Sequence, residues 1–358
     1  MALYIHPDRL IDYSDVYSDE ALKALEVLAP LNDVQKELMS ERNERRKQRI
    51  ASGKLPNFLS EEVTIGDGLK ISEIRKGNFE CSEIPTDLRR QWIQGTGPAA
   101  KPSGPIESSI RNVAYALLSG ADGWMFDGED ALGQINAMSL DNQRNLKLAI
   151  SRDPLFMEVA KQVASEMNKW SNGFLGKSIV TDWKVQLDFT TVIFRARGLH
   201  LDDRHITTEN GDSFSASITD TTLYVVNNYK TLMKNGASIV LYLPKIQTAH
   251  EAAFWNSILN SLESHLGLDL GTIKVYVLVE QLEATFQLLE IRAALGKHFV
   301  GFNTGRWDYI NSVADALVGV KDFINPNIES IGMTYAYMAA YEDRVRRTVN
   351  TPDRNGNC

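Results

Sequence analysis

Cysteine is scarce in this sequence. Only Cys81 and Cys358 occur among its 358 residues, so we expect neither a disulfide framework nor a thiolate metal cluster, and a reducing compartment is favoured. Residues 1–8 contain no cationic stretch followed by an apolar one, which argues against an ordinary secretory signal. No apolar run approaches the roughly 20 residues that span a bilayer. These absences predict a cytoplasmic protein with no membrane partner.

Positive charge is also in short supply. There are 38 Lys and Arg residues against 46 Asp and Glu residues, which gives a formal net charge of −8 at pH 7. Because nucleic-acid binders carry a basic surface, we expect no nucleic-acid partner. The sequence also lacks a phosphate-binding Walker loop, a dinucleotide-binding glycine fingerprint, a nucleophile elbow and a paired-histidine metal motif. We interpret His200 and His205 as structural residues of a loop.

Short apolar runs alternate with helical patterns from about residue 90 onward. Strands that alternate with helices predict a parallel sheet with right-handed crossovers. Polar or charged residues follow many of the runs, as they do at the active-site end of a (β/α)₈ barrel. We therefore predict an α/β fold of this TIM-barrel type, incomplete because only seven candidate strands are found. These strands are residues 91–93, 123–126, 191–194, 238–243, 273–279, 299–302 and 331–334.

The rest of the chain completes the expected domain plan. Residues 18–52 have the spacing of one or two surface helices, and glycines and a proline in 53–88 indicate short strands and loops. We predict an N-terminal region over 1–88 and a barrel over 89–358. The long span 131–188 between two strands predicts an inserted small subdomain.

Two carboxylates follow neighbouring candidate strands. Glu280 comes directly after the run 275–279, and Asp308 follows the next run within the segment 301–309. One strand-helix-strand step separates the two acids, so we expect them side by side on one rim. Mg²⁺ binds one or two carboxylates and leaves its other positions to water and substrate. The alternative is that both acids are solvent-facing loop residues.

Arg195 ends another candidate strand, where a guanidinium can stabilise a developing oxyanion. The alternative is a structural ion pair with an acid such as Asp127. Asp127, Glu129 and Asp130 form an acidic cluster after a further strand, and they are candidates to orient metal-bound water. The alternative there is an acidic cap for the next helix.

Two further features are weaker. Lys245 ends a strand and is a candidate Schiff-base lysine, although a charge-balancing role is favoured. The turn 303–306 offers consecutive backbone N–H groups, and Gly305 permits the close approach of a small carboxylate.

Taken in order, these segments resemble the malate synthase family in its shorter single-chain form, over nearly the whole chain. The main similarity is Val-Gly-Phe-Asn-Thr-Gly-Arg-Trp-Asp-Tyr-Ile at residues 300–310. Residues 53–58, 95–98, 126–130, 195–201 and 242–247 are also similar, and several motifs in the family's order are more specific than any one of them.

The resemblance implies a (β/α)₈ barrel with an N-terminal helical clasp and an Mg²⁺-dependent acyltransferase of the glyoxylate cycle. In that family, glyoxylate and acetyl-CoA condense to malate and free CoA. By position, Glu280 and Asp308 match the metal ligands and Arg195 the catalytic arginine. The backbone of Gly305, Arg306 and Trp307 matches the glyoxylate site. Glu129 and Asp130 match the outer acidic shell.

One part of the family pattern is missing. The general base of the family is an Asp in a helical domain after the last barrel strand, and this chain contains neither that strand nor that domain. Three hypotheses therefore stay open: a malate-synthase-type enzyme, an Mg²⁺-dependent lyase or aldolase acting on another 2-oxo acid, and a non-catalytic homologue that binds metal and a 2-oxo acid. Either the sequence is a truncated form of a longer enzyme, or the gap is filled in another way. The candidates are a partner subunit or a second copy of the chain that completes the barrel, or an unrelated use of the scaffold.

Overall fold

The computed structural model describes residues 2–66, 68–90, 93–94, 104–130 and 136–358. The expected motif at 95–98 and residues 91–92 of the first candidate strand lie outside these ranges. The described chain divides into two compact units. The first unit comprises residues 1–29, 84–197 and 201–242, and the second comprises residues 30–83, 198–200 and 243–358. The expected boundary at residue 88 stays a prediction.

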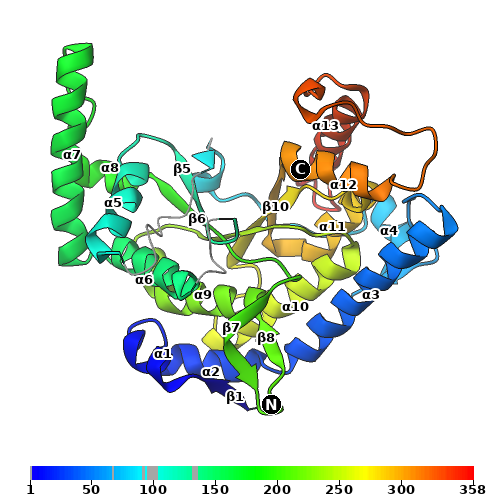
Figure 1. The fold of residues 1–358 in the computed structure, drawn as a ribbon, viewed down its shortest axis with the longest axis horizontal. Coiled ribbons are helices and arrows are strands. Elements are labelled where there is room, and N and C mark those ends of the chain that lie inside the picture. The colour runs from blue at the N-terminus through cyan, green and yellow to red at the C-terminus, as the bar shows by residue number, and fades with distance from the viewer. Residues whose placement is uncertain (1, 67, 91–92, 95–103, 131–135) are drawn as a thin grey trace. The chain divides into compact units, whose positions relative to one another are not determined.

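Parallel strands form the centre of the first unit (Figure 1). Strand β4 (Ile93–Gln94) pairs with β5 (Gly123–Asp127), β5 pairs with β6 (Thr191–Arg195), and β6 pairs with β9 (Ile239–Leu243). Every residue of β5 and β9 is buried, as continuous apolar runs in a parallel sheet are expected to be. The register sets Asp127 opposite Arg195, so the two side chains that end these strands are neighbours.

Helices connect and extend these strands. Helices α1 (Pro7–Asp12), α2 (Asp19–Leu28), α5 (Ile106–Leu117) and α9 (Ala216–Lys234) belong to the first unit, together with a short 3₁₀ helix, η1 (Thr86–Leu88). The predicted insertion is helical, with α6 (Met138–Ile150), α7 (Pro154–Leu175) and α8 (Trp183–Phe189). The bounds of α7 follow from its ends, because the Asp153 side chain accepts a hydrogen bond from the Leu155 N–H and Gly176 adopts the left-handed conformation that terminates helices.

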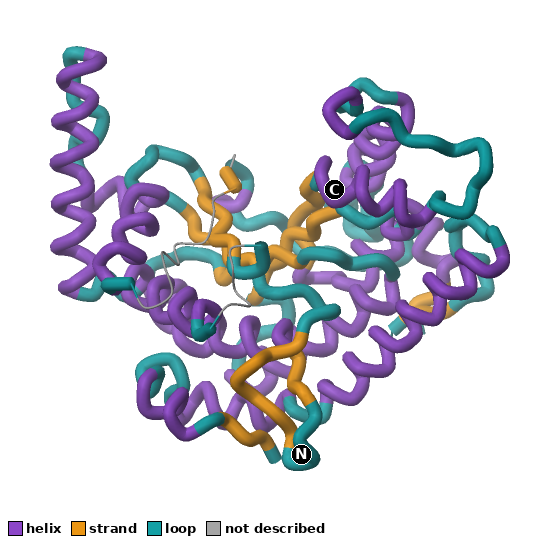
Figure 2. The backbone as a smooth tube through the Cα atoms, viewed as in Figure 1, coloured by secondary structure: helices purple, strands orange, loops and turns teal. Residues whose placement is uncertain are grey.

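A small antiparallel sheet in the first unit was not predicted. Strands β1 (Leu3–Ile5), β7 (Asp202–Thr208) and β8 (Ser213–Ser215) form it, and Figure 2 shows them as a separate group of strands. His205 therefore lies in a strand, and the expectation of a loop there is wrong. Strand β7 could not be recognised from an apolar run, because its buried residues include two polar ones. These buried residues are Asp203, Ile206 and Thr208.

Among its described residues, the second unit is built on two parallel strands and five α-helices of eight or more residues. Strand β10 (Ile273–Val279) pairs with β11 (Phe299–Thr304), and Val279 lies opposite Thr304. The helices are α3 (Leu31–Ser52), α10 (Ala249–Leu266), α11 (Leu288–Leu295), α12 (Arg306–Ala316) and α13 (Ala336–Val349). Shorter elements are β2 (Thr64–Ile65), β3 (Leu69–Lys70), α4 (Ile71–Arg75), η2 (Glu283–Phe286), η3 (Gly296–His298) and η4 (Ile328–Ser330).

Residues 331–334, which lie within the described ranges, do not form the seventh strand that their apolar character predicted. They follow η4 and turn into α13, with the Tyr335 N–H donating to the Gly332 carbonyl. The Ile331 carbonyl accepts two hydrogen bonds from the Arg306 guanidinium. A side chain thus satisfies the backbone group that a strand would have paired in a sheet. Helix α13 packs against β11 and α11.

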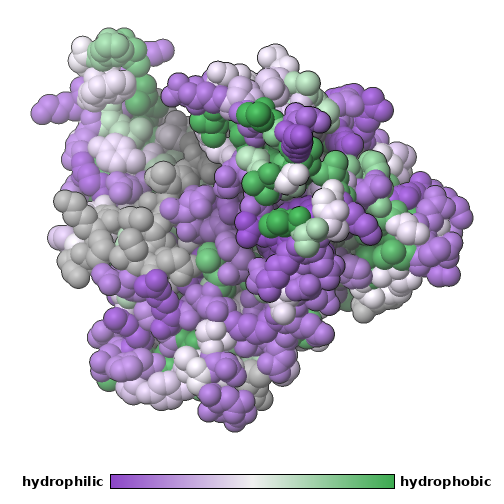
Figure 3. Space-filling model, turned by 45° about the vertical axis from the view of Figure 1, so that its right-hand side comes forward, coloured by the Kyte–Doolittle hydropathy of each residue, from purple (hydrophilic) through white to green (hydrophobic). Residues whose placement is uncertain are grey.

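Aromatic side chains fill much of the core of the first unit. Trp124, Phe126, Phe194 and Tyr224 are buried and contact one another in sequence, with ring centroids 4.8–5.9 Å apart. Hydrophilic residues cover most of the face drawn in Figure 3, and hydrophobic residues form smaller patches between them. None of the helices in the described part of the chain is both long and apolar enough to cross a membrane.

Candidate active site

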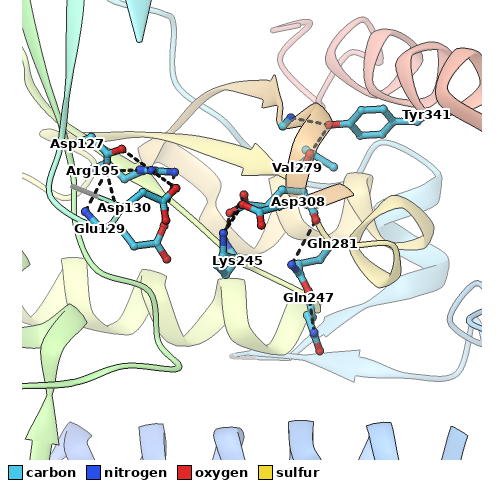
Figure 4. Close-up of polar contacts among 12 residues, drawn as sticks. Asp127, Glu129, Asp130, Arg195, Lys245, Gln247, Val279, Gln281, Asp308 and Tyr341 are labelled. Atoms are coloured by element: carbon cyan, nitrogen blue, oxygen red, sulfur yellow. Dashed lines mark hydrogen bonds and ion pairs between the residues drawn. The ribbon is translucent and has the colours of Figure 1, made fainter. Parts of the chain in front are cut away.

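Glu280 and Asp308 converge on a single cation in the second unit. Glu280 follows β10 directly, and Asp308 lies in the first turn of α12, just after β11. The Lys245 ammonium donates to Glu280 Oε2 at 3.2 Å and to Asp308 Oδ2 at 2.5 Å (Figure 4). The Glu280 side chain is 1% exposed and that of Asp308 is 40% exposed. The sequence predicted the adjacency of the two carboxylates but not the cation between them.

Lys245 is also held through its backbone. Its N–H donates to Glu280 Oε1 at 2.8 Å, so one residue binds both oxygens of that carboxylate. Its carbonyl accepts a hydrogen bond from the Arg42 guanidinium at 3.0 Å. The backbone φ of Lys245 is +57°, in the left-handed region that non-glycine residues rarely adopt. Such strained residues cluster at functional sites, because only surrounding contacts maintain them.

Gly305 brings the ends of β10 and β11 into close contact. Its N–H donates to the Val279 carbonyl at 3.2 Å and to the Tyr341 hydroxyl at 2.9 Å, and that hydroxyl donates in turn to the Val279 carbonyl. A Cβ at position 305 would lie 3.0 Å from Glu280 Cβ and 3.0 Å from Leu278 Cδ1. A side chain at this position would therefore crowd the β10 side chains, and glycine avoids that contact.

Arg306 and Trp307 begin α12 beside this contact. The Arg306 guanidinium binds the Ile331 carbonyl and lies 4.6 Å from the Trp307 ring centroid, so that side chain has a structural role. Trp307 is 59% exposed. Within the described part of the chain, no side-chain hydrogen bond caps α12. The first N–H groups of a helix have no intrahelical acceptor, and they form a natural position for an anion.

Arg195 is surrounded by the predicted acidic cluster in the first unit. Its guanidinium donates to both oxygens of Asp127, at 2.8 and 2.5 Å, and to Asp130 Oδ2 at 2.5 Å. Glu129 Oε2 lies 3.5 Å from Arg195 Nη1. Burial lowers the pKa of Arg195, but the bonds and charges of the three acids outweigh it and raise that pKa above its ordinary value. The guanidinium is therefore permanently charged, and Asp127 orients it.

The backbone supports this cluster. Asp127 Oδ1 accepts hydrogen bonds from the Glu129 and Asp130 N–H groups, each at 3.0 Å. The Gly128 N–H donates to the Arg195 carbonyl, and a Cβ at position 128 would lie 2.7 Å from that oxygen. The acids do not cap the next helix described, because α6 begins at Met138 with Ala137 as its N-cap. Residues 131–135, which follow the cluster, lie outside the described ranges, so the alternative interpretation as a helix cap stays open.

The predicted residues thus form two groups, one within each unit. The structure brings Glu280 together with Asp308, and Arg195 together with Asp127, Glu129 and Asp130. The catalytic and binding roles of all these residues stay predictions. Sequence reasoning missed Tyr341, which lies on α13 far from Gly305 in the chain, and no local pattern distinguishes it from other helix residues.

A metal ion fits the donor set of the second unit. Among the described residues, no group of three or more His, Cys, Asp and Glu side chains is arranged to hold a metal. Mg²⁺ does not need such a group, because one or two carboxylates are enough when water and substrate supply the other oxygens. The Lys245 ammonium is a cation that contacts both acids, which shows that oxygens of Glu280 and Asp308 can contact one positive centre.

Comparison with known proteins gives a consistent result. The family model described as "Malate synthase, TIM barrel domain" matches residues 191–356. Malate synthase A of Escherichia coli (strain K12) is 31% identical over 301 residues, which are 84% of this chain and 49% of that protein. Malate synthase of Myxococcus xanthus (strain DK1622) is 30% identical over 348 residues, which are 96% of this chain and 56% of that protein.

A plant relative agrees with the bacterial ones. The glyoxysomal malate synthase of Gossypium hirsutum is 31% identical over 305 residues, which are 84% of this chain and 47% of that protein. This chain spans about half the length of the curated relatives that it matches. The α/β architecture with parallel strands agrees with the matched barrel domain. The chain belongs to the malate synthase family.

Proposed function

We propose that this chain carries the Mg²⁺-dependent condensation of glyoxylate with acetyl-CoA, in which water cleaves the thioester to give malate and free CoA, in the glyoxylate cycle. Family membership supports the reaction class, an acyltransferase. The observation that carries the proposal is the convergence of Glu280 and Asp308 on one cation. We also propose a cytoplasmic location, in keeping with the sequence composition.

In this proposal, Glu280 and Asp308 hold the metal ion. A bound Mg²⁺ supplies Lewis-acid polarisation of the glyoxylate aldehyde. Glu280 is buried, so its carboxylate is held in place, while the 40% exposure of Asp308 leaves room for ligands from solvent. The Lys245 N–H donates to Glu280 Oε1, and the Arg42 guanidinium holds the Lys245 carbonyl, so both contacts support the position of the Glu280 carboxylate.

The first turn of α12 is proposed to bind the glyoxylate carboxylate. Its backbone N–H groups at Arg306 and Trp307 point from a helix N-terminus, where the partial positive charge favours an anion. The Gly305 N–H already donates to Val279 and Tyr341. We therefore assign Gly305 a supporting part: its missing side chain lets the turn lie against Glu280.

Arg195 is proposed to stabilise the negative charge that develops on the thioester oxygen of acetyl-CoA. A preorganised cation in a water-poor site is more effective than one in solvent, because it needs no reorganisation during the reaction. The two bonds to Asp127 and the burial of Arg195 provide this preorganisation. Asp127, Glu129 and Asp130 are proposed as the acids that orient this guanidinium and nearby water.

The release of free thiol from acetyl-CoA, measured with glyoxylate and Mg²⁺, tests this function. We expect malate as the product and a loss of about 10²-fold or more in rate for Glu280→Gln and Asp308→Asn, the typical cost of removing one electrostatic stabiliser. Asp315→Asn is the matched control, because Asp315 also lies on α12 but pairs with Arg46.

The same experiment separates the other hypotheses. Metal-dependent binding of glyoxylate without thiol release, even at high protein concentration, would contradict the condensation and favour a non-catalytic homologue. Turnover of a different 2-oxo acid without acetyl-CoA would indicate a lyase or an aldolase. Equal rates for Asp308→Asn and Asp315→Asn would remove the proposed metal site.

A further inference from the structure

Lys245 occupies the position that a metal ion would take between Glu280 and Asp308. Its ammonium contacts Glu280 Oε2 and Asp308 Oδ2, and its backbone N–H contacts Glu280 Oε1. Both oxygens of the buried Glu280 carboxylate are therefore engaged by this one residue. A metal ion that binds Glu280 and Asp308 together has to share or take a Glu280 oxygen that Lys245 now holds.

The position of Lys245 is built into the fold. The Arg42 guanidinium holds its carbonyl, its φ is +57°, and its side chain is 16% exposed. A flexible surface lysine would not combine a left-handed backbone with three contacts to two acids. The ammonium also neutralises part of the repulsion between the two carboxylates, which otherwise disfavours bringing them together.

We propose that Lys245 is an internal counter-ion that occupies the cation site in the metal-free protein and leaves it when a divalent metal binds. This inference rests on the proposed function, because it takes Glu280 and Asp308 as the metal ligands. Lys245 is a positioning residue: it keeps the two carboxylates converged before the metal arrives. The ammonium cannot remain between them afterwards, because a divalent cation at the same point repels it and uses the same oxygens.

The exchange has a measurable cost for metal affinity. When only a fraction of the molecules is competent to bind, the apparent dissociation constant is the intrinsic one divided by that fraction. An ammonium that occupies the site in about nine molecules of ten weakens metal binding about tenfold. Removal of the ammonium should therefore raise the metal affinity by about tenfold, although it also removes the partner that holds the two acids together.

The test is the binding of Mn²⁺, without glyoxylate or acetyl-CoA, measured by the electron paramagnetic resonance of the free ion. We expect Lys245→Met to bind Mn²⁺ about tenfold more tightly than the wild-type protein. The matched control is Lys297→Met, which removes an exposed ammonium paired with Glu80 at the other end of β11. The control should bind Mn²⁺ as the wild type does.

Glu280→Gln separates failure of this inference from failure of the proposed function. If the wild type binds no Mn²⁺, or if Glu280→Gln binds Mn²⁺ as the wild type does, the proposed metal site is wrong and the inference is overturned with it. If Glu280→Gln abolishes binding but Lys245→Met binds no more tightly than the wild type, only the inference is overturned.

A second measurement uses the wild-type protein and does not depend on the folding of a variant. Acetylation of individual lysines by an amine-reactive reagent is followed by mass spectrometry, with and without Mg²⁺. We expect the Lys245 labelling rate to rise severalfold with Mg²⁺, since the ammonium leaves its ion pairs, while that of Lys297 stays constant. A Lys245 rate that is unchanged or slowed by Mg²⁺ would overturn the inference.

Discussion

Addition of one methyl group at Gly305 should disturb the proposed metal site. In Gly305→Ala, the new Cβ meets Glu280 Cβ and Leu278 Cδ1 at 3.0 Å, which is closer than ordinary van der Waals contact. The φ of Gly305 is −107°, which alanine adopts without strain, so the effect comes from crowding alone. Glu280 cannot move away freely, because it is buried and Lys245 holds its carboxylate.

The expected magnitude follows from the cost of overpacking a well-packed site. Extra methyl groups in such sites cost about 1–3 kcal/mol, so we expect urea unfolding to show a loss of stability in this range. A displaced Glu280 should also weaken Mn²⁺ binding severalfold. Gly319→Ala in the same unit is the control, because nothing lies within 4 Å of its added Cβ. Equal stability and equal Mn²⁺ affinity for the two variants would refute this account of Gly305.

Three other predictions address separate contacts. Tyr341→Phe removes the hydroxyl that donates to the Val279 carbonyl and should cost about 1–2 kcal/mol in urea unfolding; unchanged stability would show that the contact is dispensable. Arg195→Lys keeps the charge but loses the paired bonds to Asp127, so kcat should fall about 10²–10³-fold, and a wild-type kcat would rule out the oxyanion role. Burial lowers the pKa of His298 from 6.5 to about 4, so between these pH values the unfolded chain binds a proton at this residue and the folded chain does not. The free energy of unfolding should therefore fall by about 3 kcal/mol from pH 6.5 to pH 4 because of His298. His298→Asn should show a smaller fall, and an equal dependence of stability on pH in the two proteins would contradict the lowered pKa of His298.

Local patterns in the sequence were enough to predict the type of fold. The apolar runs at 123–126, 191–194, 238–243 and 273–279 contain buried parallel strands. A strand that is buried on both faces has a continuous apolar sequence, which can be recognised without knowledge of the elements that pack against it. The run 331–334 failed as a strand. Its four residues carry too little pattern to distinguish a strand from a turn, and the Arg306 guanidinium competes for its backbone.

Some of the candidate site residues could also be placed from the sequence. The positions of Asp127 and Arg195 could be predicted, because parallel strands in register bring their terminal residues together. The adjacency of Glu280 and Asp308 follows from the same rule and from the family motif around Gly305. These predictions needed only the strand order and the ends of the strands.

The sequence by itself determined which charged side chains lie at strand ends, because strand periodicity and chain connectivity are local properties. Only the tertiary structure decided which of these charges meet. The left-handed backbone of Lys245 directs both its N–H and its ammonium to Glu280, and Tyr341 reaches Gly305 from a separate helix. Such contacts depend on rotamers and on packing between segments distant in sequence, and no local pattern encodes either of them.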